Sequence, residues 1–349
     1  MTFKAFISGC ASTALTPAET ELFGRERPCG LILFARNVQS PGQVQALVAD
    51  FKAAVGSDEV LILIDQEGGR VQRLRPPHWR AMPPARVFGD LYASDPEAAK
   101  RAAFAGARLI AAELTDLGIN VNCTPCIDVP QEGAHDIIGD RAFSTDPEVV
   151  SALGRAVMDG TLAGGVLPVI KHVPGHGRAL ADSHKSLPRI DASKEELEQV
   201  DFKPFRALHD APLAMTAHVL LPVCDECHPA TLSPAIMGKV IRDQMGLTGL
   251  IMSDDIGMEA LEGSYADRTR AVIAGGCDVV LHCSGKFAEM TDVAGAAPLL
   301  EGKPAERFEA ARAALHDPEP FDEAEALALV TEAAGTRVAS LGPDPTVQA

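Results

Sequence analysis

One segment of the chain carries an unusual density of side chains that can bind a ligand or move a proton. Lys171 and His172 close the apolar run VLPVI, the turn-forming residues PGHG follow, and Asp182 and His184 come next. In an extended segment residues two apart project to the same side, so the carboxylate of Asp182 can accept a hydrogen bond from one imidazole nitrogen of His184. The other nitrogen then carries a transferable proton near neutral pH. The pattern is compatible with an acid/base pair, a metal site or a polar turn.

Other reactive side chains end apolar runs elsewhere in the chain. Asp65 ends EVLILID, Asp254 and its neighbour end GLIMSDD, Arg141 lies in GDRAFS, and His218 lies late in LAMTAHVL. Charged groups in such positions are costly unless they are paired or face a cleft. A carboxylate such as Asp254 is suited to attack an anomeric carbon when a second group protonates the departing oxygen. The Asp182–His184 pair can supply that second group.

Eight short apolar runs recur along the chain and predict the elements that position these side chains. They alternate with segments rich in Ala, Leu and Glu, two of which begin with the helix-capping signals Asp95-Pro96 and Asp146-Pro147. Eight such units predict a (β/α)8 barrel of the TIM type, with an open doubly wound sheet as the alternative. The runs span residues 3–8, 30–34, 59–65, 119–125, 166–173, 213–220, 249–255 and 277–283.

A barrel makes a claim about function, because reactive groups gather where its strands end. Asp65, Lys171, His172 and Asp254 all end predicted strands, so we expect one shared site on one face. No G-x-G-x-x-G follows the first strand, which weakens a dinucleotide-binding interpretation. We expect residues 1–349 to form a single catalytic domain that ends, over about 320–349, in one helix (322–338) and a frayed tail.

The charge of the chain limits the kinds of partner that it can bind. The net charge of −17 argues against nucleic acid or an anionic membrane as a partner, because either would demand a basic face. The N-terminal segment is too polar to be a signal peptide, since only Ala5–Ile7 separate Lys4 from Ser8. We therefore expect a cytoplasmic protein whose eight cysteines are reduced thiols.

No metal or other cofactor is expected. The pairs Cys123/Cys126 and Cys224/Cys227 lie much farther apart than the about 15–20 residues of a ribbon-type zinc site. The Val-Pro-Gly between His172 and the histidine at 176 prevents the helix that would place both imidazoles on one face.

The order of motifs resembles that of the glycoside hydrolase family 3 β-N-acetylglucosaminidases of the bacterial NagZ type. The resemblance covers nearly the whole chain, through GLILFARNVQSP (30–41), IDQEGGRVQRL (64–74), NVNCTPCIDV (120–129), GDRAFSTDP (139–147), KHVPGHG…DSH (171–184), MTAHV (215–219) and SDDIGMEAL (253–261). It implies that Asp254 is the nucleophile and that Asp182 and His184 form the acid/base dyad on a mobile loop.

The resemblance also implies the substrate. Asp65, Arg141, Lys171 and His172 would bind the hydroxyls of a terminal N-acetylglucosamine (GlcNAc). The activity would be a retaining exo-β-N-acetylglucosaminidase that removes GlcNAc from GlcNAc-β-1,4-anhydroMurNAc, with or without peptide, in peptidoglycan recycling. Small muropeptide fragments would then be its partners, with the protein a monomer or weak homodimer. Three alternatives stay open: a β-N-acetylglucosaminide phosphorylase, a metal-dependent amidohydrolase and a catalytically silent sugar-binding protein.

Overall fold

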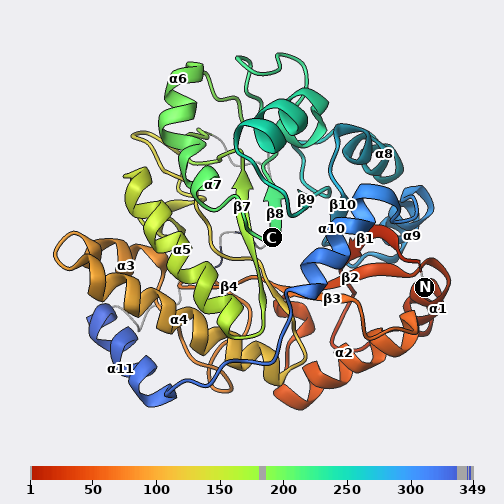
Figure 1. Ribbon diagram of the computed structural model, residues 1–349. Helices are drawn as coiled ribbons and strands as arrows, with labels where there is room; N and C mark the ends of the chain where they lie inside the picture. Colours follow the sequence, from red (N-terminus) through yellow and green to blue (C-terminus); the bar gives the residue numbers. More distant parts are fainter. Residues whose placement is uncertain (1, 181–185, 336–343, 345, 347–349) are drawn as a thin grey trace.

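A closed barrel of eight parallel strands forms the centre of the molecule in the computed structural model, which describes residues 2–180, 186–335, 344 and 346 (Figure 1). Around the barrel the strands follow the order β1-β10-β9-β8-β7-β6-β3-β2. Their bounds are β1 (Lys4–Ser8), β2 (Pro28–Leu33), β3 (Leu61–Ile64), β6 (Val121–Asn122), β7 (Leu167–Val173), β8 (Leu213–Thr216), β9 (Leu250–Asp255) and β10 (Val279–His282).

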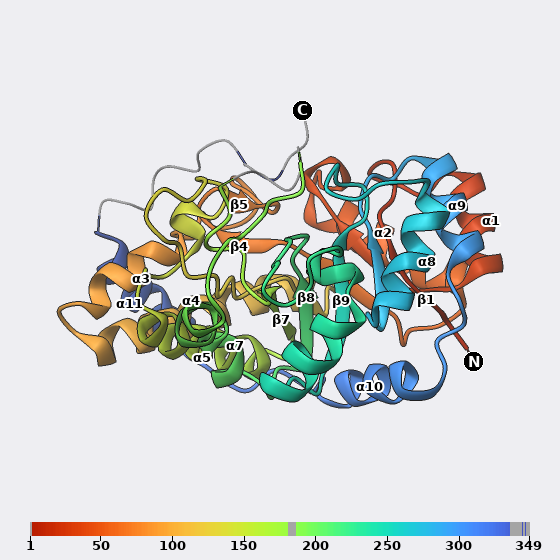
Figure 2. The same ribbon diagram turned by 90° about the horizontal axis from the view of Figure 1, so that it is seen from above.

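Helices surround the barrel and cover the outer faces of its strands (Figures 1 and 2). They are α1 (Pro17–Glu26), α2 (Pro41–Val55), α3 (Ala85–Tyr92), α4 (Pro96–Asp116), α5 (Pro147–Ala163), α6 (Lys194–Glu196), α7 (Lys203–Ala207), α8 (Tyr265–Gly275), α9 (Phe287–Ala296), α10 (Gly302–Ala313) and α11 (Glu323–Ala334). A further helical segment spans Ile236–Gln244. The last helix, α11, packs outside the barrel against α4 and α3.

The strands form because their residues are apolar on both faces. Every residue of β2, β3 and β7 is buried, as expected for parallel strands enclosed by helices outside and by side chains inside. Helix starts follow the predicted signals, since Asp95 and Asp146 each accept a hydrogen bond from a backbone N–H of the first turn. Each of the eight predicted runs overlaps one barrel strand, although β2 begins at Pro28, two residues before its predicted run, so the predicted fold is confirmed.

Three details differ from the sequence-based expectation. A two-stranded antiparallel hairpin, β4 (Gln66–Gly68) and β5 (Val71–Gln72), follows β3 and was not predicted. β8 ends at Thr216, so His218 lies beyond the strand in which it was placed. The last helix ends at Ala334, before the predicted end at 338. In the described part of the chain, no helix is both long enough and apolar enough to cross a membrane.

Helix α3 packs closely at Gly89 against the loop that carries Arg141. A Cβ atom added at Gly89 would overlap the backbone carbonyl oxygen of Phe143, two residues after Arg141. Glycine is therefore required here for packing rather than for its backbone angles.

Gly89→Ala should lower the free energy of unfolding by about 1–3 kcal/mol, since either α3 or the Phe143 backbone must shift. Urea unfolding measures the effect. Gly42→Ala on α2 is the matched control, because a Cβ there meets no atom within 4 Å. Equal stability of the two variants would contradict the packing role of Gly89.

Candidate active site

A cavity of about 470 Å³ opens at the carboxyl ends of the barrel strands. Five of the predicted site residues line it: Asp65, Arg141, Lys171, His172 and Asp254. Among the lining residues that were not assigned to the site are Arg73, His176 and Thr346. The cavity volume is typical of a site for a small molecule.

The cations of the site are held by two nearly buried carboxylates. Lys171 Nζ lies 2.8 Å from Asp65 Oδ1 and 2.6 Å from Glu67 Oε1. Glu67 also accepts two hydrogen bonds from Arg141, at 2.9 Å from Nε and 2.8 Å from Nη2. This two-pronged contact fixes the plane of the guanidinium group as well as its position. Glu67 therefore joins two of the predicted sugar-binding residues to each other.

The pairing controls the protonation of these groups. Burial favours the neutral form of Glu67, but the charges of Arg141 and Lys171 outweigh it and lower the pKa of its carboxyl to about 2. The same balance, with Lys171 and Arg73 as partners, lowers the pKa of Asp65. Burial would likewise lower the pKa of Lys171, yet Asp65 and Glu67 raise it. All of these groups are charged at neutral pH.

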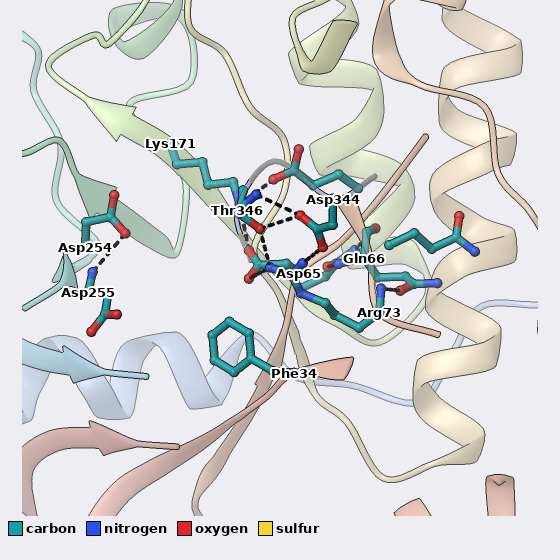
Figure 3. A network of polar contacts seen from close by, with 12 residues as sticks. Phe34, Asp65, Gln66, Arg73, Lys171, Asp254, Asp255, Asp344 and Thr346 are labelled. Atoms are coloured by element: carbon teal, nitrogen blue, oxygen red, sulfur yellow. Dashed lines mark hydrogen bonds and ion pairs between the residues drawn. The ribbon is translucent and has the colours of Figure 1, made fainter. Parts of the chain in front are cut away.

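The hairpin β4–β5 places Arg73 beside Asp65. Gln66 holds the turn closed, because its side-chain oxygen accepts from the backbone N–H of Arg73 at 2.9 Å and its side-chain nitrogen donates to Leu74 O at 2.9 Å. Arg73 Nη2 then lies 3.0 Å from Asp65 Oδ2, and its guanidinium lies over the ring of Phe34 (Figure 3). The signal for Glu67 and Arg73 was present in IDQEGGRVQRL, where charged residues flank a glycine turn directly after a strand.

A third buried carboxylate, Asp128, orients His172. Its Oδ2 lies 2.7 Å from His172 Nδ1, and its Oδ1 accepts from the backbone N–H of His176 at 2.7 Å. Burial raises the pKa of Asp128, but the contacts with the two histidines outweigh this and lower it. Since Nδ1 of His172 is engaged with Asp128, Nε2 is the ring nitrogen left to meet a ligand.

His176 lies against the same cavity, and burial lowers the pKa of its imidazole to about 4. Neither of its ring nitrogens has a hydrogen-bond partner among the described residues. Nearby, a Cβ at Gly177 would overlap the backbone of Val129, so this glycine is needed for a close approach.

Asp254 lies at the end of β9, with 9% of its surface exposed, and it faces the cavity. The backbone N–H of Asp255 donates to Asp254 Oδ1 at 2.8 Å and holds the carboxylate in place. Asp255 itself has a structural role, because its Oδ1 accepts from the backbone N–H groups of Gly257 and Cys283. In Figure 3, Asp254 lies apart from the group formed by Asp65, Arg73 and Lys171. The site thus has a carboxylate on one side and paired cations on the other.

His218 lies elsewhere than expected, and Asp182 and His184 lie outside the residues that the structure describes. His218 is buried behind the site, with Nδ1 at 2.8 Å from Thr231 Oγ1 and Nε2 at 3.0 Å from Asp255 O, and it does not line the cavity. Its role is to connect two strand ends. Asp182 and His184 lie outside the described residues, so their assignment as the acid/base dyad stays a prediction.

One group in the described part of the chain has donor atoms close enough to share a metal ion: Cys126, Asp128 and His172, within 4.8 Å of one another. Its chemistry fits a metal poorly, because Asp128 Oδ2 and His172 Nδ1 already bond each other. Burial and the charge of Asp128 also raise the pKa of the Cys126 thiol well above its usual value, which disfavours the thiolate that a metal requires.

Comparison with known proteins gives a consistent result. Residues 12–313 match the Glycosyl hydrolase family 3 N terminal domain. A beta-hexosaminidase of Chromobacterium violaceum is 39% identical over 303 residues, which are 86% of this chain and 84% of that protein. A beta-hexosaminidase of Xanthomonas axonopodis pv. citri is 40% identical over 280 residues, 79% of this chain and 82% of that protein. The crystal structure of NagZ from Neisseria gonorrhoeae is similar with a TM-score of 0.84 and 30% identity, covering 98% of this chain and 99% of that one.

Replacing Glu67 tests the ion pairing. Glu67→Gln should cost about 3–5 kcal/mol of stability at pH 7, because Lys171 and Arg141 lose their shared counter-charge. The folded pKa of about 2 lies below the ordinary 4.5, so the contribution of Glu67 is complete above about pH 4.5 and is lost as the pH falls toward 2. The stability difference between the unmodified chain and Glu67→Gln should therefore narrow as the pH falls from about 5 to 3.

Chemical unfolding at a series of pH values measures this difference. Glu332→Gln, at an exposed position on α11, is the matched control and should show no such trend. A difference that stays constant between pH 7 and pH 3 would show that the charge of Glu67 does not stabilise the fold.

Proposed function

The chain belongs to glycoside hydrolase family 3, and on that premise we propose that it is a retaining exo-β-N-acetylglucosaminidase. Its relatives make it a glycoside hydrolase of the β-hexosaminidase type. One observation supports the finer proposal most: Asp254 lines the same cavity as Asp65, Lys171, Arg141 and His172. A neutral sugar with many hydroxyls suits this arrangement, because the paired ions offer both donors and acceptors without excess charge.

The proposed reaction has two steps at C1 of the sugar. A carboxylate oxygen of Asp254 bonds to C1 while the bond from C1 to the leaving oxygen breaks, and His184 gives its proton to that oxygen. Water then transfers a proton to His184 and attacks C1, which releases the sugar from Asp254 with its configuration retained. Asp182 would hold the other imidazole nitrogen and stabilise its charged form.

The residues of the opposite side would bind the sugar in a fixed orientation. Asp65 can accept from sugar hydroxyls, whereas Lys171, Arg141 and Nε2 of His172 can bond sugar oxygens. Their pairing through Glu67 and Asp128 fixes them before the substrate arrives, so little conformational freedom is lost on binding. One similar structure, NagZ from Neisseria gonorrhoeae, is in complex with N-trifluoroacetyl-D-glucosamine, which supports an N-acylated glucosamine as the ligand here.

We extend the proposal to the natural substrate. The resemblance to the NagZ type favours GlcNAc-β-1,4-anhydroMurNAc and its peptides, acted on in the cytoplasm during peptidoglycan recycling. Residues 1–349 would form one catalytic domain, an inference supported by the packing of α11 on α3 and α4. Release of GlcNAc from this disaccharide, compared with release from chitobiose, tests the assignment of the substrate.

Removal of the nucleophile should abolish turnover. Asp254→Ala is expected to release no measurable chromophore from an aryl β-N-acetylglucosaminide, while Asp50→Ala, an exposed aspartate on α2, retains full rate. Added azide should restore turnover by entering the space of the lost carboxylate, and the product should be the α-glycosyl azide. Substantial turnover of Asp254→Ala without azide would remove Asp254 from this role.

His184 should matter in proportion to the basicity of the leaving group. His184→Ala should lose about 10²–10⁴-fold in kcat/KM on the disaccharide, whose leaving oxygen needs a proton. On a dinitrophenyl glycoside, which needs little protonation, the loss in kcat/KM should be much smaller. Equal losses on both substrates would exclude His184 as the acid. Measuring products with and without phosphate in the same assay separates a hydrolase from a phosphorylase.

A further inference from the structure

The ion pairs beside the cavity form one alternating chain, and the C-terminal tail supplies its last member. The chain runs from Arg141 to Glu67, Lys171, Asp65 and Arg73, with each neighbouring pair in contact. These five groups comprise three cations and two carboxylates. The side chain of Arg73 is only 1% exposed, and a buried cation without sufficient counter-charge is costly.

Asp344 provides the missing negative charge. Its Oδ2 pairs with Nη1 of Arg73, whereas Asp65 contacts Nη2 of the same guanidinium (Figure 3). With Asp344 included, three carboxylates and three cations alternate, and these six groups together have a net charge of zero. The Asp344 side chain is itself only 8% exposed, so the pair is shielded from water and little screened by salt.

Thr346 strengthens the same contact. Its Oγ1 accepts from Arg73 Nη2 at 2.8 Å and donates to Asp344 Oδ1 at 2.7 Å, while its backbone N–H donates to the same oxygen at 2.9 Å. The two residues therefore approach Arg73 as a unit already bonded within itself. The sequence-based expectation of a frayed tail is wrong for Asp344 and Thr346.

Asp344 and Thr346 lie beside the cavity, next to Arg73. Thr346 lines the same cavity as Asp65 and Asp254, a cavity of about 470 Å³. Figure 3 shows Asp344 and Thr346 on the side of Asp65 and Arg73, away from Asp254. If Asp254 bonds C1, Asp344 and Thr346 lie toward the opposite, non-reducing end of the sugar.

We propose that Asp344 and Thr346 are positioning residues of the sugar site, which close its non-reducing end and hold Arg73 and Asp65 in place for the terminal sugar. The inference rests on the proposed function and deepens it. A wall at this end restricts the subsite to a terminal sugar, which is the geometry that exo-acting hydrolysis requires. Through Arg73, Asp344 and Thr346 fix the carboxylate of Asp65, which would contact the sugar.

Asp344→Ala tests the proposal in the full-length chain. We expect KM for an aryl β-N-acetylglucosaminide to rise about tenfold or more, because the loss of a charge-assisted contact loosens Arg73 and Asp65, with kcat changed by less than about twofold. The KM of Asp344→Asn should lie between those of the unmodified chain and of Asp344→Ala, since asparagine keeps the shape of the side chain but loses its charge. Asp50→Ala is the matched control and should leave both constants unchanged.

A double-variant comparison separates positioning from general destabilisation. In an Arg73→Ala background, Asp344→Ala should raise KM no further, because Asp344 acts through Arg73. Three results would each overturn the proposal: a KM equal to that of the control, a higher kcat/KM in Asp344→Ala, as expected of an inhibitory tail, or additive effects of Asp344→Ala and Arg73→Ala.

The two hypotheses fail in distinguishable ways. An unmodified chain that hydrolyses no N-acetylglucosaminide would disprove the proposed function. Calorimetric titration with GlcNAc then tests the role of Asp344 and Thr346 separately. Asp344→Ala should raise the Kd for GlcNAc about tenfold over that of the unmodified chain. Hydrolysis by the unmodified chain with no effect of Asp344→Ala would disprove only the inference about the tail.

Discussion

The site depends on burying several ions next to one another at the end of an apolar barrel. Each ion alone would lose more hydration energy than the barrel could compensate. The arrangement is stable because carboxylates and cations alternate from Arg141 through Glu67, Lys171 and Asp65 to Arg73 and Asp344. The same pairing keeps Glu67, Asp65 and Lys171 charged at neutral pH, so that donors and acceptors face the cavity in fixed positions. Stability and ligand recognition therefore depend on the same contacts.

The barrel makes this alternation possible by bringing together residues distant in the sequence. Asp65 follows β3, Lys171 lies within β7, and Arg141 lies in the loop between β6 and α5. Parallel strands end at one face, so the three side chains meet there although they come from separate segments. Glu67 belongs to a short hairpin directly after β3, and its position lets one carboxylate contact both cations. β9 places the carboxylate of Asp254 in the same cavity, apart from Asp65, Arg73 and Lys171 (Figure 3).

Much of this arrangement was predictable from the sequence because it follows from local patterns. Apolar runs of strand length gave the eight strands, and the charged residues that end them gave Asp65, Lys171, His172 and Asp254. Glu67 and Arg73 were missed because their partners are set by a hairpin too short to show a strand pattern. The role of Asp344 was missed for a different reason. Its partner Arg73 lies 271 residues earlier in the sequence, and no local pattern in GPDPTVQA encodes such a contact. His218 was misplaced because a histidine near a strand end can equally bond the backbone behind the site.

In the proposed reaction, Asp254 becomes covalently bonded to the sugar while the buried ion pairs hold that sugar in place. The most direct test uses His184→Ala with a dinitrophenyl β-N-acetylglucosaminide, because the first step then needs no acid and the second lacks its base. Rapid acid quenching, peptide digestion and mass spectrometry locate the sugar. We expect a peptide that carries one N-acetylglucosaminyl group on Asp254. A sugar bonded to another residue, or turnover that yields the α-configured product with no bonded peptide, would contradict it.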